Sequence, residues 1–364
     1  MIPYGRQHLD DDDIRAVVDV LRGDWLTQGP AVERFEATLA DAVEARHAIA
    51  FSSGTAALHA AAAAAGLGPG HTVHTSPLSF AASAACARYV GADVAFTDID
   101  PATLNLDLAA VPEDADALVA VHYAGLPADL SRLRHRPRVL IEDAAHALGA
   151  RTPDGPVGNC ARSDMAVFSF HPVKAVTTGE GGAVTTNDDG LAETLRVARS
   201  HGMRRRPELG EWYYEINGPG WNYRLTDMGA ALGTSQLAKL NRFIDRRNEL
   251  AARYRALLAD LPLALPPLAP AGWRHAYHLF PVRVPRRREV YQALHAAGIR
   301  AQVHYIPIYR HPWYAAFGSA ESCPHTETAY QGLLSLPMFP AMRDADQDTV
   351  VEVLRAALRD GTAA

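Results

Sequence analysis

The first half of the chain alternates short apolar runs with stretches of helical periodicity. Each run ends in polar residues or glycine, which is typical of a buried strand. The runs cover residues 47–53, 71–77, 92–100, 116–125, 138–143, 164–170 and 181–187. Helical patterns lie between several of them, including an alanine-rich one at 54–66 and another at 79–91. Strands that alternate with helices predict an α/β fold, in which helices cover both faces of a mostly parallel central sheet.

The pattern changes after residue 187, where helical periodicity dominates. Residues 189–203 predict an amphipathic helix, and residues 224–260 predict either one long helix or two helices with a bend. A proline-rich segment at 261–273 follows, and it is the clearest boundary signal in the chain.

Beyond that boundary the chain has the pattern of a second, smaller unit. Apolar segments at 275–284 and 300–309 flank a helical pattern at 286–297, which predicts a small α+β domain. We therefore expect a large domain over residues 1–260, with an N-terminal segment that reaches the active site, and a small C-terminal domain over residues 261–364.

Composition narrows the function mainly by exclusion. A formal net charge of −6 leaves no basic surplus for binding nucleic acid or an anionic membrane. The three cysteines (Cys86, Cys160 and Cys323) form no Cys-x-x-Cys pair, which argues against a zinc site or disulfide framework and favours a reducing cytoplasm. The N-terminus has no leader pattern, and the longest apolar run is too short for a membrane span. We expect a cytoplasmic protein without a bound metal.

Polar residues follow several of the predicted strands. In an open parallel sheet the ligand binds beyond the carboxyl ends of the strands, so these residues are candidates for a site. They are Ser53, Gly54 and Thr55 after the first strand, Asp143 and His146 after the fifth, and Ser169 at the end of the sixth.

Lysine is rare in this chain, which has 33 arginines but only Lys174 and Lys239. A lysine amine can lose its proton when it is buried, whereas an arginine guanidinium stays protonated, and only a neutral amine forms a Schiff base. Lys174 lies next to a glycine-rich run at 179–182, where the backbone can approach a ligand closely. Lys239 lies on the predicted long helix, and a solvated helix face explains it.

Together these residues meet the needs of a pyridoxal phosphate site. Such a site requires a lysine for the aldehyde, an anion cradle for the phosphate and a carboxylate for the pyridinium nitrogen. Lys174 and Asp143 supply the first and the last, and the Ser-Gly-Thr sequence at a helix N-terminus supplies the cradle, with Ser169 adding a hydroxyl. Phe80 offers a flat face for the ring. Each feature alone is weak, because Ser-Gly-Thr also caps ordinary helices, but their order on alternating strands is specific.

These motifs resemble those of the DegT/DnrJ/EryC1/StrS family of pyridoxal-phosphate-dependent sugar aminotransferases. The similarity covers nearly the whole chain and is carried by IPYGRQHLDDDD, SSGTAAL, EDAAHALGA, SFHPVKAVTTGEGGAV, RSHGM, WNYRLTDMGAALGTSQL and QVHYIPIY. It implies the aspartate-aminotransferase fold (PLP fold type I), with the mostly parallel sheet in the large domain.

The resemblance also implies roles for the matching residues. Lys174 would form the Schiff base with the cofactor and then carry the proton between the substrate carbon and the cofactor. Asp143 would pair with the pyridinium nitrogen, His146 would lie near the phenolic oxygen, and Phe80 would stack on the ring. The remaining cofactor-binding residues would be Ser53, Gly54, Thr55, Ser169 and the partner's Asn222.

The implied substrates are L-glutamate and a nucleotide-linked deoxysugar with a keto group at C4. The implied assembly is a homodimer whose two active sites are shared between subunits. Positions that contact the nucleotide sugar in relatives match Tyr4, Trp25, Leu26, Thr27, Tyr305, Ile306, Pro307, Ile308 and Tyr309.

Other functions fit the sequence less well. An aminotransferase for an antibiotic aminosugar or an aminocyclitol stays open. A related sugar dehydratase would carry histidine at the Schiff-base position, so Lys174 argues for transamination. The complete set of cofactor residues counts against a non-catalytic regulator. A metal hydrolase built on Glu142, Asp143 and His146 would have suitable ligand types, but the sequence shows no further cluster to complete it.

Overall fold

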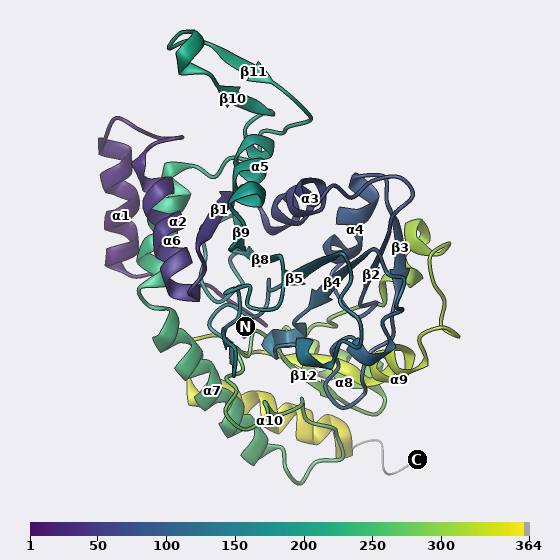
Figure 1. Cartoon of the computed structure of the whole chain (residues 1–364). Coiled ribbons are helices and arrows are strands. Elements are labelled where there is room, and N and C mark those ends of the chain that lie inside the picture. The colour runs from purple at the N-terminus through teal and green to yellow at the C-terminus, as the bar shows by residue number, and fades with distance from the viewer. Residues whose placement is uncertain (360–364) are drawn as a thin grey trace.

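The computed structural model describes residues 1–359 and is built around a seven-stranded sheet (Figure 1). In spatial order the strands are β1 (His47–Phe51), β9 (Gly182–Thr186), β8 (Met165–Ser169), β5 (Val139–Asp143), β4 (Ala117–Val121), β2 (Thr72–Thr75) and β3 (Asp93–Phe96). β9 runs antiparallel to both of its neighbours, whereas the other adjacent strands pair in parallel. The predicted α/β fold with a mostly parallel sheet is confirmed.

Helices cover both faces of this sheet. One face carries α3 (Gly54–Ala64), α4 (Ala82–Tyr89) and α5 (Asp189–Arg199), and the other carries α2 (Pro30–Val43), α6 (Asp227–Leu237) and the start of α7 (Leu240–Leu257). Strand β1 shows the cause, because successive strand residues point to opposite faces. Ile49 and Phe51 pack in the core beneath α3, whereas Ala48 and Ala50 pack in the core beneath α2.

The long helical pattern at 224–260 forms two helices, α6 and α7, which are separated at Ala238 and Lys239. The solvated-face interpretation of Lys239 was wrong. Its ammonium group forms ion pairs with Asp10 and with Asp13, whose Oδ2 lies 2.8 Å away. Asp13 belongs to α1 (Asp11–Arg22) and is only 1% exposed. The partners are more than 200 residues away in sequence, so local periodicity could not show this pairing.

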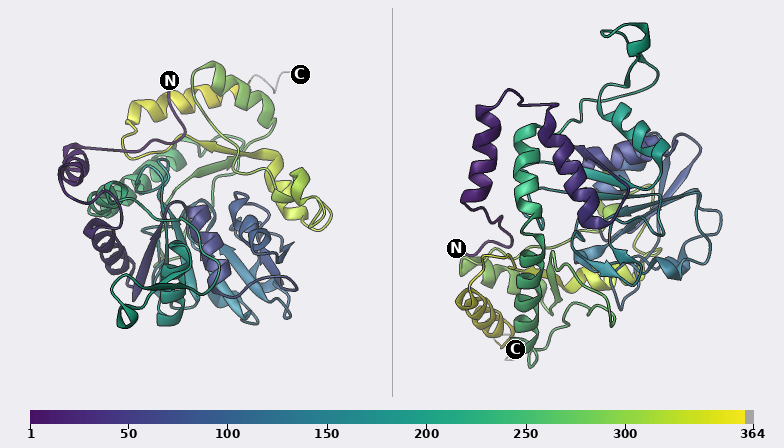
Figure 2. Two further views of the ribbon diagram at one scale, coloured as in Figure 1. Left: turned by 90° about the horizontal axis from the view of Figure 1, so that it is seen from above. Right: turned by 60° about the vertical axis from the view of Figure 1, so that its left-hand side comes forward.

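A second core lies at the C-terminal end of the chain. It contains β12 (Phe280–Arg283) paired antiparallel with β13 (Leu333–Leu336), together with α8 (Arg287–Ala296) and α10 (Asp344–Arg359). The C-terminal half of α7 and Ile2 pack into the same core. The backbone of Ile2 also pairs with Ile299, so the N-terminal segment lies beside this unit (Figure 2). The boundary at residues 260 and 261 stays a prediction.

A hairpin projects from the body of the molecule above α5 (Figure 1). It consists of β10 (Met203–Arg205) and β11 (Tyr214–Ile216), which pair antiparallel. Its large apolar residues are exposed, and they include Leu209, Trp212, Tyr213, Tyr214 and Ile216. The hairpin therefore forms an exposed apolar surface on the single chain, and such surfaces are typical of sites that contact another molecule.

Shorter elements complete the described chain. They are the strand pair β6 (Arg151–Thr152) and β7 (Gly155–Pro156), helix α9 (Pro324–Gly332), and 3₁₀ turns at Leu108–Ala110, Tyr123–Gly125, Leu130–Arg132, Pro207–Leu209, Ile308–Arg310 and Pro312–Tyr314. None of the helices described up to residue 359 has the length and apolar character needed to cross a membrane.

Candidate active site

The carboxyl ends of β1, β5 and β8 open onto a cavity of about 460 Å³. Its lining includes eight of the cofactor-binding residues predicted from the sequence. These are Ser53, Gly54, Thr55, Phe80, Asp143, His146, Ser169 and Lys174. The fold therefore brings residues from positions 53 to 174 to one place, because the ends of parallel strands meet at the same edge of a sheet.

One wall of the cavity has the form of an anion cradle. Ser53 is the N-cap of α3, and its hydroxyl oxygen accepts the amide N–H of Ala56 at 3.1 Å. A Cβ atom on Gly54 would lie 2.9 Å from the Cβ of Ser169, which is closer than real side chains approach. Glycine at this position thus lets the N-terminus of α3 lie against the end of β8. The free N–H groups of that first turn, with nearby hydroxyls, suit a phosphate.

Lys174 lies in a turn that follows β8, where its backbone N–H donates to the carbonyl oxygen of His171 at 2.9 Å. Burial lowers the pKa of Lys174 to about 8, although the negative charge of Asp143 opposes part of this shift. A lysine with this pKa is partly neutral near physiological pH, and a neutral amine is the form that attacks an aldehyde.

The lowered pKa of Lys174 predicts how cofactor capture depends on pH. The cofactor-free protein should bind pyridoxal phosphate covalently at a rate that rises with pH through a midpoint near 8, because Lys174 loses its proton there. At pH 7 about a tenth of the Lys174 side chains would be neutral. For an ordinary lysine the neutral fraction at this pH is on the order of 10²-fold smaller.

Stopped-flow absorbance between about pH 6 and pH 10 measures this rate. A free lysine derivative measured in parallel corrects for the titration of the cofactor itself. A corrected midpoint at or above about pH 10 would show that Lys174 has the pKa of an exposed lysine.

Asp143 faces the cavity from the end of β5 and is 7% exposed. Its Oδ2 accepts the hydroxyl of Ser83 at 2.6 Å, and its Oδ1 accepts the amide N–H of Ala145 at 3.2 Å. A carboxylate at the end of a buried strand would be expected to have a cationic partner. Within residues 1–359, no arginine or lysine forms an ion pair with it, although Lys174 lies near enough for the two charges to interact. The direct contacts of the carboxylate are the hydrogen bonds from Ser83 and Ala145.

His146 has one ring nitrogen in use and one free. Its Nε2 lies 3.1 Å from the hydroxyl of Tyr305, and its ring contacts that of His278 with 4.3 Å between the centroids. Its Nδ1 is buried and has no hydrogen-bond partner among the described residues. Burial, and secondarily the charge of Lys174, holds the pKa of His146 well below its usual value. The neutral ring thus has a buried polar atom that a bound group could satisfy.

The C-terminal part of the chain closes the cavity with residues that the sequence did not single out. His278 and His304 line it, and burial lowers the pKa of His304 to about 4. The hydroxyl of Tyr123, which follows β4, donates to the carbonyl of His304 and connects this segment with the end of that strand. The sequence HAYHLFP contains His278, but no local pattern connects it with Lys174 more than 100 residues earlier.

The residues predicted to contact a nucleotide sugar lie in different environments. Tyr4 and Tyr305 line the cavity. Trp25, Leu26, Thr27 and Ile306 are exposed and lie outside its lining. Pro307, Ile308 and Tyr309 are buried. Ile308 is 0% exposed and packs in the core beneath α3, and the hydroxyl of Tyr309 donates to Glu327 at 2.8 Å. For the residues outside the lining, contact with a nucleotide sugar stays a prediction.

Asn222 does not line the cavity of its own chain. Its side chain is exposed, while the neighbouring Tyr223 accepts the amide N–H of Ser52 at 2.7 Å through its backbone carbonyl. The segment is therefore held beside the cradle but presents Asn222 outward. A role in the partner's site stays a prediction.

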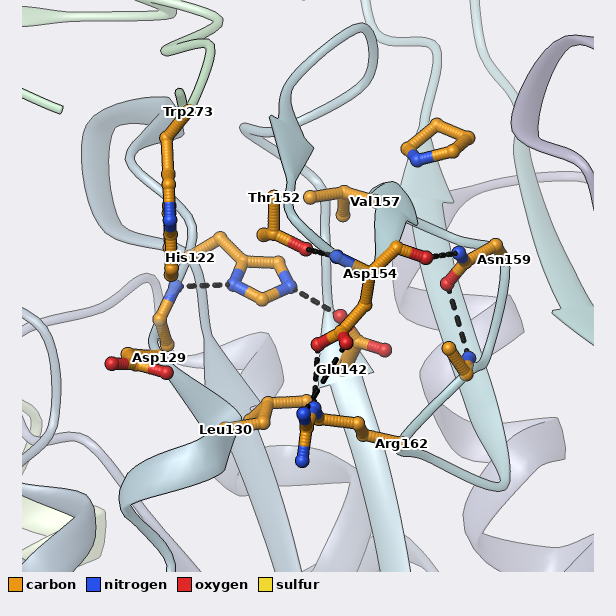
Figure 3. A pocket seen from close by; sticks show the side chains of 13 residues that line it. His122, Asp129, Leu130, Glu142, Thr152, Asp154, Val157, Asn159, Arg162 and Trp273 are labelled. Atoms are coloured by element: carbon orange, nitrogen blue, oxygen red, sulfur yellow. Dashed lines mark hydrogen bonds and ion pairs between the residues drawn. The ribbon is translucent and has the colours of Figure 1, made fainter. Parts of the chain in front are cut away.

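Glu142 lies on the face of β5 opposite to Asp143, as the alternation of strand residues requires. It accepts a hydrogen bond from Ser163. It accepts another from His122, whose Nε2 is 2.7 Å away, and His122, Glu142 and Trp273 line a small pocket (Figure 3). The metal-site alternative therefore fails, because Glu142 and Asp143 point apart. No group of three potential metal-ligating side chains occurs in the part of the chain that the structure describes.

The components of the cavity fit pyridoxal phosphate. The cradle, the lysine with a lowered pKa, the buried carboxylate and the unsatisfied imidazole nitrogen match the phosphate, aldehyde, ring nitrogen and phenolic oxygen of this cofactor. The fold and the cavity thus define a pyridoxal-phosphate-dependent enzyme with an aminotransferase fold.

Comparison with known proteins identifies the family. A model of the DegT/DnrJ/EryC1/StrS aminotransferase family matches residues 7–355. SpsC of Bacillus subtilis, a spore coat polysaccharide biosynthesis protein, is 37% identical over 97% of this chain and 96% of its own length. The chain belongs to the DegT/DnrJ/EryC1/StrS aminotransferase family.

Solved structures agree with this assignment. PseC of Helicobacter pylori, an aminotransferase involved in the biosynthesis of pseudoaminic acid, is 30% identical with a TM-score of 0.90 over 99% of both chains. The PMP form of the putative sugar aminotransferase Spr1654 of Streptococcus pneumoniae has a TM-score of 0.92 at 26% identity, over 99% of this chain and 100% of that one. The family, the fold and the pyridoxal phosphate cofactor expected from the sequence are confirmed, and the enzyme is a sugar aminotransferase.

Proposed function

We propose that the enzyme transfers the amino group of L-glutamate to the C4 keto group of a nucleotide-linked deoxysugar. The observation that carries the proposal is the cavity in which Lys174, with its pKa near 8, lies close enough to Asp143 for their charges to interact. The descriptions of PseC and SpsC support a sugar as the acceptor.

Bound pyridoxal phosphate supplies an electron sink for the carbon from which a proton is removed. The chain's own residues prepare that chemistry. Lys174 would accept the proton of the substrate carbon at its neutral Nζ and would carry it between that carbon and the cofactor. A pKa near 8 suits a group that both accepts and returns a proton. Asp143 would hold the protonated ring nitrogen with its carboxylate. His146 offers its free Nδ1 to the phenolic oxygen, and the exposed face of Phe80 supports the ring.

Residues of the chain also support one substrate class within the family. The segments LTQGP, SFHPVK, VHYIPIY and LLSLPMFP resemble those of the UDP-4-amino-4,6-dideoxy-N-acetyl-β-L-altrosamine transaminase of pseudaminic acid synthesis. We therefore propose a UDP-linked 4-keto-6-deoxy sugar as the acceptor.

A panel of acceptors tests this proposal. The purified enzyme is first converted by glutamate to its amino form, and UDP-, dTDP- and GDP-linked keto-sugars are then added one at a time. We expect a UDP-linked 4-keto sugar to restore the absorbance of the aldehyde form fastest. A faster return with dTDP-linked sugars would replace the proposed substrate with an antibiotic-type aminosugar precursor. No return with any nucleotide sugar would reject the substrate class.

We further propose that the working unit is a homodimer with shared active sites. The exposed Asn222 and the projecting hairpin, with its exposed Trp212 and Tyr214, support this proposal. A second copy of the chain would cover this apolar surface, and its Asn222 would reach the phosphate cradle that Ser53 and Gly54 form.

Mixed dimers should reveal the sharing of sites. In a homodimer of either variant, Lys174→Ala or Asn222→Ala, both active sites lack one of the two residues. A mixed dimer has one site in which both residues are intact. Random exchange of equal amounts leaves about a quarter of all sites intact, so activity should recover to about a quarter of wild type. Tagged subunits and native mass spectrometry confirm exchange. Activity no greater than the sum of the parents, after confirmed exchange, would reject shared sites.

A further inference from the structure

The buried carboxylate of Asp143 is held by hydrogen-bond donors and forms no ion pair with an arginine or lysine of residues 1–359. Burial disfavours a charged group unless opposite charge or hydrogen-bond donors compensate for the lost water. The side chain is 7% exposed, and it has no ion-pair partner of the arginine or lysine type in the chain up to residue 359. The shortest contact that it makes is the 2.6 Å hydrogen bond from Ser83.

The proton of the Ser83 hydroxyl has two acceptors within reach. Oδ2 of Asp143 lies at 2.6 Å and the carbonyl oxygen of Phe80 at 3.3 Å. An ionised carboxylate is the stronger acceptor and is also the nearer one, so the proton points to Asp143. The hydroxyl of Ser79 lies 2.7 Å from that of Ser83. Because Ser83 has already used its proton, Ser79 donates to Ser83, and the two hydroxyls form a chain directed at Asp143.

The position of this chain links it to the cofactor platform. Ser79 lines the cavity, whereas Ser83 is fully buried behind it on α4. Phe80 lies between them in sequence and is 61% exposed. One turn of chain therefore presents the flat face for the ring on its exposed side and the hydroxyl pair to Asp143 on its buried side.

We propose that Ser83, supported by Ser79, is a positioning residue that holds the carboxylate of Asp143 in orientation toward the ring nitrogen of the cofactor. Ser83 acts through Asp143 and touches neither the cofactor nor the substrate. The inference rests on the proposed function, because it requires that the partner of Asp143 is that ring nitrogen.

The variant Ser83→Ala tests the inference in the holoenzyme. A hydrogen bond to a charged group that is lost without replacement corresponds to about a tenfold change in an equilibrium constant. We expect the dissociation constant of pyridoxal phosphate, measured by quenching of protein fluorescence, to rise about tenfold. We also expect the glutamate half-reaction to slow by a similar factor, on the order of tenfold. Ser83→Cys keeps the size of the side chain but donates weakly, so it should resemble Ser83→Ala.

Ser163→Ala is the matched control, because Ser163 donates a similar hydrogen bond to the neighbouring Glu142 on the opposite face of β5. This variant should bind the cofactor with an affinity within about a factor of two of wild type, because it removes a hydroxyl–carboxylate hydrogen bond that lies outside the cavity. An equal loss of affinity in both variants would show a general effect on the fold and overturn the inference.

A double-mutant cycle separates the inference from the proposed function. In an Asp143→Asn background, Ser83→Ala should change affinity and rate by less than about twofold, because no charge remains to be held. A full tenfold effect in that background would overturn the inference. If Asp143→Asn slows the half-reaction but Ser83→Ala does not, the inference fails and the proposed function stands. If Asp143→Asn has no effect, the proposed role of Asp143 itself fails.

Discussion

Replacing Lys174 with arginine should abolish both the covalent attachment of pyridoxal phosphate and transamination. Arginine keeps a positive charge and a similar length, but its guanidinium stays protonated and cannot form the Schiff base or move a proton. We expect the variant to lose the yellow colour that survives gel filtration in the wild-type enzyme. We also expect turnover to fall by at least about 10³-fold, because general acid–base catalysis is lost together with the covalent link.

The other lysine of the chain provides a matched control. Lys239→Arg can preserve the ion pairs with Asp10 and Asp13, and none of these three residues lines the cavity. This variant should keep its colour and at least about half of the wild-type rate. Turnover by Lys174→Arg at a rate close to that of wild type, after mass spectrometry has verified the substitution, would show that Lys174 is not the Schiff-base residue.

Replacing Asp143 with asparagine should preserve the fold but slow the reaction by about 10²-fold or more, on the order of 3 kcal/mol in the barrier. Asparagine has nearly the same shape, and its carbonyl oxygen can still accept the amide N–H of Ala145 while Ser83 accepts from its amino group. It carries no charge to keep the ring nitrogen protonated. The effect should therefore appear in the glutamate half-reaction at saturating cofactor, followed by stopped-flow absorbance.

Glu142→Gln is the matched control for this substitution. Glu142 is a similarly buried carboxylate next in sequence, but it points to the opposite face and accepts hydrogen bonds from His122 and Ser163. Its replacement should leave the half-reaction within a factor of about three of wild type. A half-reaction of Asp143→Asn within the same factor of three would instead make Asp143 a turn-capping residue, since asparagine caps turns as well as aspartate.

The sequence by itself determined the fold class and grouped most of the predicted residues that line the candidate site. Short apolar runs that alternate with helical periodicity predict a mostly parallel sheet with two covered faces, and the parallel strands of such a sheet end at one edge. Residues at those ends, such as Ser53, Asp143 and Ser169, could therefore be grouped from their positions along the chain alone. Lys174 could be selected because it is one of only two lysines in the chain and because only a lysine amine can form a Schiff base.

Only the tertiary structure decided what surrounds these residues. His278 and His304 line the same cavity from a segment more than 100 residues beyond Lys174, and Ser83 donates to Asp143 across 60 residues. The helical pattern around Lys239 places this residue on a face exposed to solvent, yet its side chain forms an ion pair with the buried Asp13. Local patterns report which face of an element is apolar, but the partner of a polar side chain depends on how distant elements pack. The lowered pKa of Lys174 has the same origin, because burial is a property of the assembled cavity and of no single segment.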